Sequence, residues 1–103
     1  MRQDEAYNQR QYERMLQAIE AYEKDRITFG RLTIDLEGLI QALENIPNAQ
    51  RHILLTHWGT LEDVRSLALS RSTTQFDDED NRLITATLTA LKAELIHMMP
   101  SPT

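Results

Sequence analysis

Apolar residues recur at intervals of three and four along four segments of this chain, and this spacing is the strongest constraint on its fold. The segment from Thr28 to Asn45 shows it most clearly, because its apolar side chains fall on one wide stripe of a helix. Similar stripes run through residues 4–25, 48–70 and 77–99. No stretch alternates apolar and polar residues as a half-buried strand does. The sequence therefore predicts an all-α fold, an antiparallel bundle of about four helices with short connections.

The chain has 103 residues, a length that suits one domain and is too short for two hydrophobic cores. We expect one helical domain over residues 1–103, with about the first eight residues and Pro100–Thr103 loose. Trp58 is expected to be a central anchor of the core. The predicted core consists of Leu32, Leu36, Ile40, Leu43, Leu54, Trp58, Leu61, Leu88, Leu91 and Leu95.

Residues at the segment ends set the boundaries of the predicted helices. Thr28 and Asp77 are suited to accept hydrogen bonds from the first free N–H groups of the second and fourth helices. Pro47 is expected to stop the second helix, because proline disfavours the α conformation of the residue before it. Gly38 lies in the middle of that helix, where glycine costs about 1 kcal/mol relative to alanine. A close crossing by another helix would explain a glycine at this position.

The charge balance narrows the classes of partner. The chain has 11 basic and 16 acidic residues, a net charge of −5. Because nucleic acids and anionic membranes attract basic proteins, we expect neither as a direct partner, whereas a basic protein would suit this surface. The absence of cysteine excludes disulfides and thiolate metal sites. The charged N-terminal residues do not form a signal peptide and no apolar run spans a membrane, so we expect a cytoplasmic protein.

Motifs of catalytic and cofactor sites are missing from the sequence. It has no His-Glu-x-x-His motif, no phosphate-binding glycine-rich loop and no serine elbow. Glu94 and His97 have the Glu-x-x-His spacing of di-iron bundles, but such sites need a second copy and two further glutamates. A partly exposed histidine near a helix end is the simpler interpretation of His97. We therefore expect no enzyme activity, no cofactor and no metal.

Acidic residues concentrate at two places along the chain. The second helix carries Asp35, Glu37 and Glu44 against Arg31, and the fourth begins with the run Asp77–Asp80. Carboxylates at a helix start are favoured by capping and by the helix dipole, so the run has a purely structural explanation. The alternative is a negative patch that faces a basic partner.

Several short segments in the middle of the chain resemble a known family. These are Tyr22-Glu23, Ile27–Leu32 (ITFGRL), Asp35–Leu39 (DLEGL), Leu43-Glu44 and Trp58–Glu62 (WGTLE). Together they resemble small all-helical immunity proteins of bacterial contact-dependent growth inhibition and related polymorphic toxin systems, over roughly residues 19–70. Some members of that group guard against RNase toxins of the EndoU type. The resemblance implies a protein that binds a cognate toxin C-terminal domain, a basic nuclease, and neutralises it without a cofactor.

Carboxylates are the side chains that a basic toxin would be expected to contact. The predicted partner-binding residues are Asp35, Glu37, Glu44, Glu62, Asp63, Asp77, Asp78 and Asp80. A structural role is the alternative for two of these carboxylates. Glu37 or Glu62 could instead pair with Arg31, Arg51 or Arg65 inside the bundle. The alternative function is a helical adaptor or regulatory protein that self-associates and has no toxin partner. A small enzyme is a third, disfavoured class.

Overall fold

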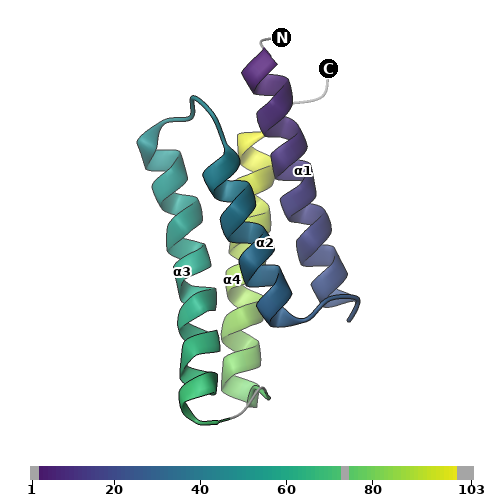
Figure 1. Ribbon diagram of the computed structural model, residues 1–103, viewed down its shortest axis with the longest axis vertical. Coiled ribbons are helices and arrows are strands. Elements are labelled where there is room, and N and C mark those ends of the chain that lie inside the picture. Colours follow the sequence, from purple (N-terminus) through teal and green to yellow (C-terminus); the bar gives the residue numbers. More distant parts are fainter. Residues whose placement is uncertain (1–2, 73–74, 100–103) are drawn as a thin grey trace.

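Four helices make up the chain in the computed structural model, which describes residues 3–72 and 75–99. They are α1 (Gln3–Glu23), α2 (Phe29–Ala42), α3 (Asn48–Ser70) and α4 (Asp78–Met98). They run alternately up and down as a bundle (Figure 1), and the described residues form no strand. The predicted all-α, four-helix fold is confirmed. In the part of the chain that is described, no helix combines the length and apolar character needed to cross a membrane.

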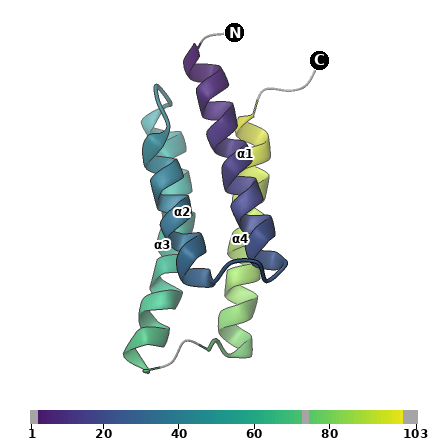
Figure 2. The same cartoon turned by 45° about the vertical axis from the view of Figure 1, so that its right-hand side comes forward.

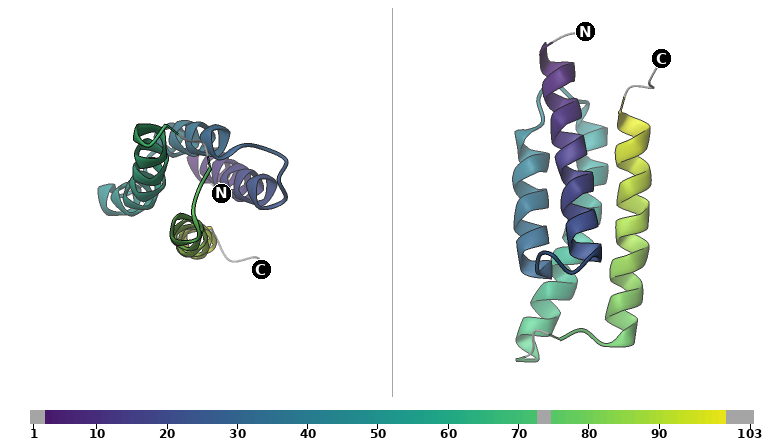
Figure 3. Two further views of the ribbon diagram at one scale, coloured as in Figure 1. Left: turned by 90° about the horizontal axis from the view of Figure 1, so that it is seen from below. Right: turned by 90° about the vertical axis from the view of Figure 1, so that its right-hand side faces the viewer.

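The helices are arranged as a curved row of three with the fourth across its open side. Seen from below, α1, α2 and α3 follow one another in the row, and α4 lies opposite α2 (Figure 3, left). Each helix packs against the next one in the chain, and α4 closes the bundle by packing against α1 as well. The packing between α1 and α4 is the least extensive of the four. The apolar stripes of all four helices face this shared interior, as a single core requires.

The core agrees with the sequence prediction except at Trp58. All nine predicted aliphatic core residues are buried, and α1 contributes three more buried side chains, Tyr12, Met15 and Ile19. Trp58 packs against the edge of the core but is only half-buried. Its indole Nε1 donates a hydrogen bond of 2.8 Å to the carbonyl oxygen of Thr33 on α2. Trp58 therefore ties α3 to α2 at the surface instead of filling the centre.

Both predicted N-caps are present. The Thr28 hydroxyl accepts a hydrogen bond of 3.1 Å from the backbone N–H of Arg31. The Asp77 carboxylate accepts one of 2.8 Å from the N–H of Asp80, whose own carboxylate accepts from the N–H of Asp77 in return. Such a reciprocal capping box satisfies two N–H groups that a helix start otherwise leaves without partners.

The second helix ends earlier than predicted, and a close helix crossing does not explain its glycine. α2 stops at Ala42, because Leu43 has an extended backbone and Asn45 a left-handed one with φ of 54°. Pro47 instead precedes the first residue of α3. The described residues show no such crossing at Gly38: a Cβ added there would meet no atom within 4 Å. Gly38 lies on the exposed side of α2, where no helix covers it.

The N-terminal segment belongs to the first helix. Residues 3–8, which lie in the segment expected to be loose, form the first turns of α1. Asn8 is 7% exposed. Its side chain binds both backbone polar groups of Glu44, in the connection between α2 and α3. It donates to the Glu44 carbonyl at 2.5 Å and accepts from the Glu44 N–H at 2.9 Å. This double contact holds the start of α1. The segment Pro100–Thr103 lies outside the described residues.

Unequal helix lengths leave one end of the bundle with only two helices. α2 has 14 residues and α3 has 23, so at 1.5 Å per residue α3 is about 13 Å longer. The lower parts of α3 and α4 continue past the connection between α1 and α2 in all views (Figures 1 and 2). We call this part, residues 63–72 and 75–85, the overhang.

Candidate partner-binding site

The overhang carries the most conspicuous apolar side chains of the surface. Six large aliphatic residues of the described chain are exposed, and three of them belong to the overhang: Leu67 at 61%, Leu69 at 51% and Leu83 at 46%. Exposed apolar side chains that gather in one region, with polar residues around them, are typical of protein-binding surfaces. Leu67 and Leu69 are two positions apart on α3, so they point to different sides of it. The overhang therefore offers apolar contacts on two sides.

On the α2 side, Leu69 borders a hollow between the overhang and the start of α2. The hollow has a volume of about 520 Å³ and is lined by Thr28, Phe29, Gly30, Arg65, Ala68, Leu69 and Phe76. The rings of Phe29 and Phe76 meet edge to face, with their centroids 5.0 Å apart at 75°. Phe29 also contacts Tyr22 in the same manner at 5.4 Å. This aromatic cluster closes the core from below and gives the hollow a rigid, mostly apolar wall.

The acidic run at the start of α4 divides into structural and free carboxylates. Asp77 and Asp80 form the capping box, and Asp80 also pairs with Arg71, Oδ2 to Nη2 at 2.8 Å. Asp78 and Glu79 are exposed, and neither has an ion pair within residues 3–72 and 75–99. Capping therefore explains Asp77 and Asp80, whereas Asp78 and Glu79 lie in the first turn, where the helix dipole favours them, and leave unpaired negative charge on the overhang.

The two adjacent carboxylates of α3 are also different from each other. Glu62 accepts hydrogen bonds from the guanidinium of Arg65 at 2.9 and 2.5 Å. These hydrogen bonds lower the pKa of the Glu62 carboxyl, and partial burial opposes them. Glu62 thus has the internal partner that the sequence left open. Asp63 is exposed at the upper edge of the overhang, with no ion pair among the residues described.

The predicted carboxylates of α2 lie on other parts of the surface. Asp35 pairs with Arg31, Oδ1 to Nε at 3.0 Å, beside a groove between α1 and α2. Glu37 is exposed and borders a smaller groove that also contains Glu62 and Trp58. Glu44 lies in the connection between α2 and α3, which is at the upper end of the molecule (Figure 1). The start of α4 is at the other end.

The eight predicted residues therefore do not form one surface. The structure brings Asp63, Asp77, Asp78 and Asp80 to the overhang, and it brings Glu37 and Glu62 to one groove. Asp35 and Glu44 are separate from both groups. Of the predicted carboxylates on the overhang, Asp63 and Asp78 are exposed and have no ion pair among the described residues; the same holds for Glu79, which the prediction did not include.

Sequence reasoning missed the apolar part of the site. Leu67, Leu69 and Leu83 are not among the predicted core or partner-binding residues, and all three are exposed. The available signal was an excess of leucine: residues 67–69 read Leu-Ala-Leu, and Leu83 directly precedes the buried Ile84. A helix with one buried stripe cannot cover all of these side chains, so some had to be exposed.

No three His, Asp or Glu side chains of the described residues are grouped closely enough to hold a metal ion. Comparison of the chain with protein-family models, with curated proteins and with solved structures gives no match.

Proposed function

We propose that this bundle is an immunity protein that binds a basic antibacterial toxin in the cytoplasm and neutralises it by covering its active site. The toxin that suits it best is an RNase of the EndoU type, in keeping with the family that residues 19–70 resemble. The observation that carries the proposal is the overhang, which combines exposed leucines, an apolar hollow and unpaired carboxylates.

The overhang has the two components of a specific protein interface. A hollow lined by Phe29, Ala68, Leu69 and Phe76 can receive one apolar side chain of a partner, and such filled pockets contribute most of the binding energy in many interfaces. Asp63, Asp78 and Glu79 are exposed on the same overhang and carry the sign of charge that a basic partner requires. The apolar contact supplies affinity, and the carboxylates supply the rate of association and the choice of partner.

Inhibition by occupancy follows from the charge of the toxin's own substrate. An RNase binds the phosphates of RNA and therefore needs a positively charged active site. Carboxylates that approach this site compete with phosphates for the same cations. The bound bundle also excludes RNA by its volume. This mechanism needs no reaction at any residue of the bundle.

The test is co-expression with the product of the adjacent upstream open reading frame, with growth rescue and pull-down as readouts. Asp63→Lys combined with Asp78→Lys should weaken toxin binding at least tenfold, because close interfacial charge pairs couple by about 1.5–7 kcal/mol. Leu69→Glu should weaken it similarly by placing a charge in the hollow. All three residues are exposed, so the melting temperature should stay nearly unchanged.

Glu13→Lys is the matched control, since it reverses an exposed carboxylate on α1. It should bind as the wild type does. Glu37→Lys asks whether the contact surface extends to α2. Binding that withstands both the double charge reversal and Leu69→Glu would contradict the overhang as the site. A neighbouring product that neither stops growth nor binds would contradict the immunity function and favour the adaptor.

A further inference from the structure

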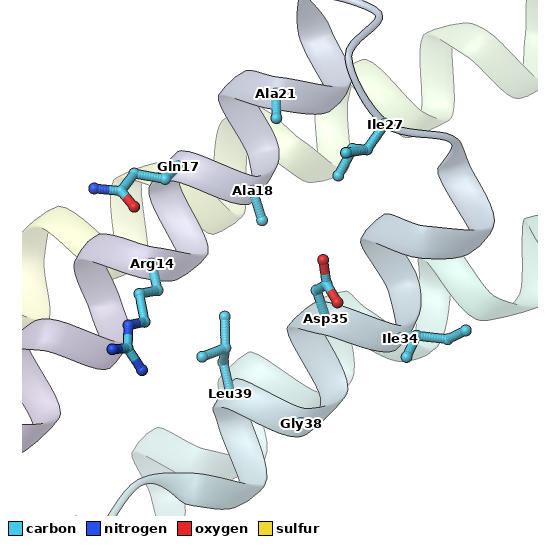
Figure 4. Close-up of a pocket in the computed structure, with 9 residues that line it drawn as sticks. All are labelled: Arg14, Gln17, Ala18, Ala21, Ile27, Ile34, Asp35, Gly38 and Leu39. Atoms are coloured by element: carbon cyan, nitrogen blue, oxygen red, sulfur yellow. The ribbon is translucent and has the colours of Figure 1, made fainter.

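A second apolar feature lies on the opposite part of the surface, between α1 and α2. An open groove of about 490 Å³ is lined there by Arg14, Gln17, Ala18, Ala21, Ile27, Ile34, Asp35, Gly38 and Leu39 (Figure 4). The small side chains of Ala18 and Ala21 and the bare backbone of Gly38 make the groove wide. Ile27 and Leu39 give it further apolar wall.

Ile34 stands beside this groove as its most prominent residue. It is 71% exposed, the largest value among the exposed large aliphatic residues of the described chain. Gly38 is one turn further along the same helix, and a Cβ there would meet open space. One face of the molecule thus carries both a protruding apolar side chain and a hollow of small residues. A surface with both features can pair with a second copy of itself across a two-fold axis, because the protruding side chain of each copy can enter the hollow of the other.

The charges around the groove favour a second copy over a basic partner. Arg14 and Asp35, the two charged residues that line the groove, balance each other, whereas the whole chain has a net charge of −5. Two copies of an acidic protein repel each other wherever the excess carboxylates lie, as at the overhang. On the balanced face this repulsion is absent, and opposite charges from the two copies can be neighbours.

We propose that the chain self-associates as a two-fold dimer through the α1–α2 groove, with Ile34 of each copy inserted between Ala18 and Gly38 of the other. The contact is small, so the dimer is weak and depends on concentration. It leaves the overhang of each copy free. The inference does not depend on the proposed function, because it concerns different residues and needs no toxin.

Sedimentation equilibrium of the full chain, from micromolar to millimolar concentration, tests the proposal. The wild type should pass from monomer to dimer. Ile34→Glu should weaken dimerisation at least tenfold. A Cβ at Gly38 meets no atom within 4 Å, and leucine has a higher helix propensity than glycine, so Gly38→Leu should narrow the groove and abolish the dimer while the melting temperature stays equal or rises. Arg14→Glu makes the face acidic and should also weaken the dimer.

Ile96→Glu is the matched control, because Ile96 is 61% exposed on α4, away from the groove. It should dimerise as the wild type does. A wild type that stays monomeric at millimolar concentration overturns the proposal. So does a dimer that survives both Ile34→Glu and Gly38→Leu, or one that Ile96→Glu disrupts equally. A monomeric wild type whose toxin binding is lost in Gly38→Leu would instead assign the groove to the toxin.

Discussion

The two ends of the bundle are held together by different kinds of polar contact. At the upper end and along the middle, hydrogen bonds join residues far apart in sequence, such as Asn8 with Glu44 and Lys92 with Glu23, which are 36 and 69 positions apart. In the overhang, Asn81 bonds to Phe76 and Arg71 pairs with Asp80, over five and nine positions. Long-range polar contacts therefore join the helices at the upper end, whereas these polar contacts of the overhang are local.

This difference indicates where the molecule can accept a partner. Local contacts stabilise a helix end by small amounts, and regions with few long-range contacts open more easily than the core. The overhang also exposes apolar side chains that the upper end buries. A partner that covers the overhang would add long-range contacts to those that Phe76 already makes with Phe29.

The largest expected contrast lies within α3 itself. Leu61→Ala should destabilise the protein by about 2–5 kcal/mol, because Leu61 is fully buried and its loss leaves a cavity. Leu67→Ala, six residues later in the overhang, should change the free energy of unfolding by less than about 0.5 kcal/mol. Urea unfolding of both variants measures the difference. Equal costs would mean that Leu67 is packed, in contradiction to its exposure.

Asn8 tests the tertiary polar contacts of the upper end. Asn8→Ala should cost about 1–3 kcal/mol, since it leaves both the N–H and the carbonyl of Glu44 without their partner. Asn8→Asp keeps the acceptor and loses the donor, so part of the cost should remain. Asn81→Ala is the matched change in the overhang and should be nearly neutral, because Asn81 is exposed and its bond to Phe76 is 3.5 Å long. Thermal unfolding measures both costs. If Asn81→Ala lowers the melting temperature more than Asn8→Ala does, the proposed difference between the two ends of the bundle is wrong.

The capping box tests how much the overhang depends on local contacts. Asp77→Ala should cost about 0.5–2 kcal/mol by removing the N-cap of α4. Asp78→Ala removes an adjacent carboxylate that caps nothing and should cost less. Circular dichroism during denaturation gives both values. If Asp78→Ala costs as much, the general charge near the helix start matters and the specific cap does not.

The smallest effect concerns the Glu62–Arg65 pair beside the overhang. Arg65 lowers the pKa of the Glu62 carboxyl in the folded state, so the ionised form is favoured by folding. The pair therefore adds stability at pH values above the carboxyl's unfolded pKa, and this is lost as the pH falls through its folded pKa. The gain should stay below about 1 kcal/mol, because both side chains are partly exposed. Glu62→Gln should match the wild type in acid and be slightly less stable at neutral pH, as measured by melting temperature.

The sequence predicted the features that depend on local pattern. Apolar spacing gave the four helices and nine aliphatic core residues, and the caps at Thr28 and Asp77 followed from side-chain chemistry. It did not predict the overhang, which depends on how far α3 and α4 continue past the connection between α1 and α2 (Figure 1). The role of Asn8 was hidden too, because a polar residue near the chain start resembles a solvent-exposed one until its partner 36 positions away is known.

The candidate site was only partly predictable for a related reason. A carboxylate's position in sequence does not tell whether a nearby arginine neutralises it, as Arg31 does for Asp35 and Arg65 for Glu62. Both pairs are three or four positions apart, a spacing that was visible in the sequence. Which leucines of α3 stay uncovered depends on the length of its neighbours, and this appears only when the helices are assembled.

The way α2 ends has a consequence for folding. The last turn of α2 has no capping side chain of its own; instead Arg51 of α3 donates to the carbonyl oxygens of Ile40 and Leu43 at 2.7 and 2.6 Å. A helix of 14 residues is marginal by itself in water. α2 therefore completes its hydrogen bonding only when α3 has formed and docked. The two helices should gain and lose structure as one cooperative unit, with amide protons of both exchanging at a common rate.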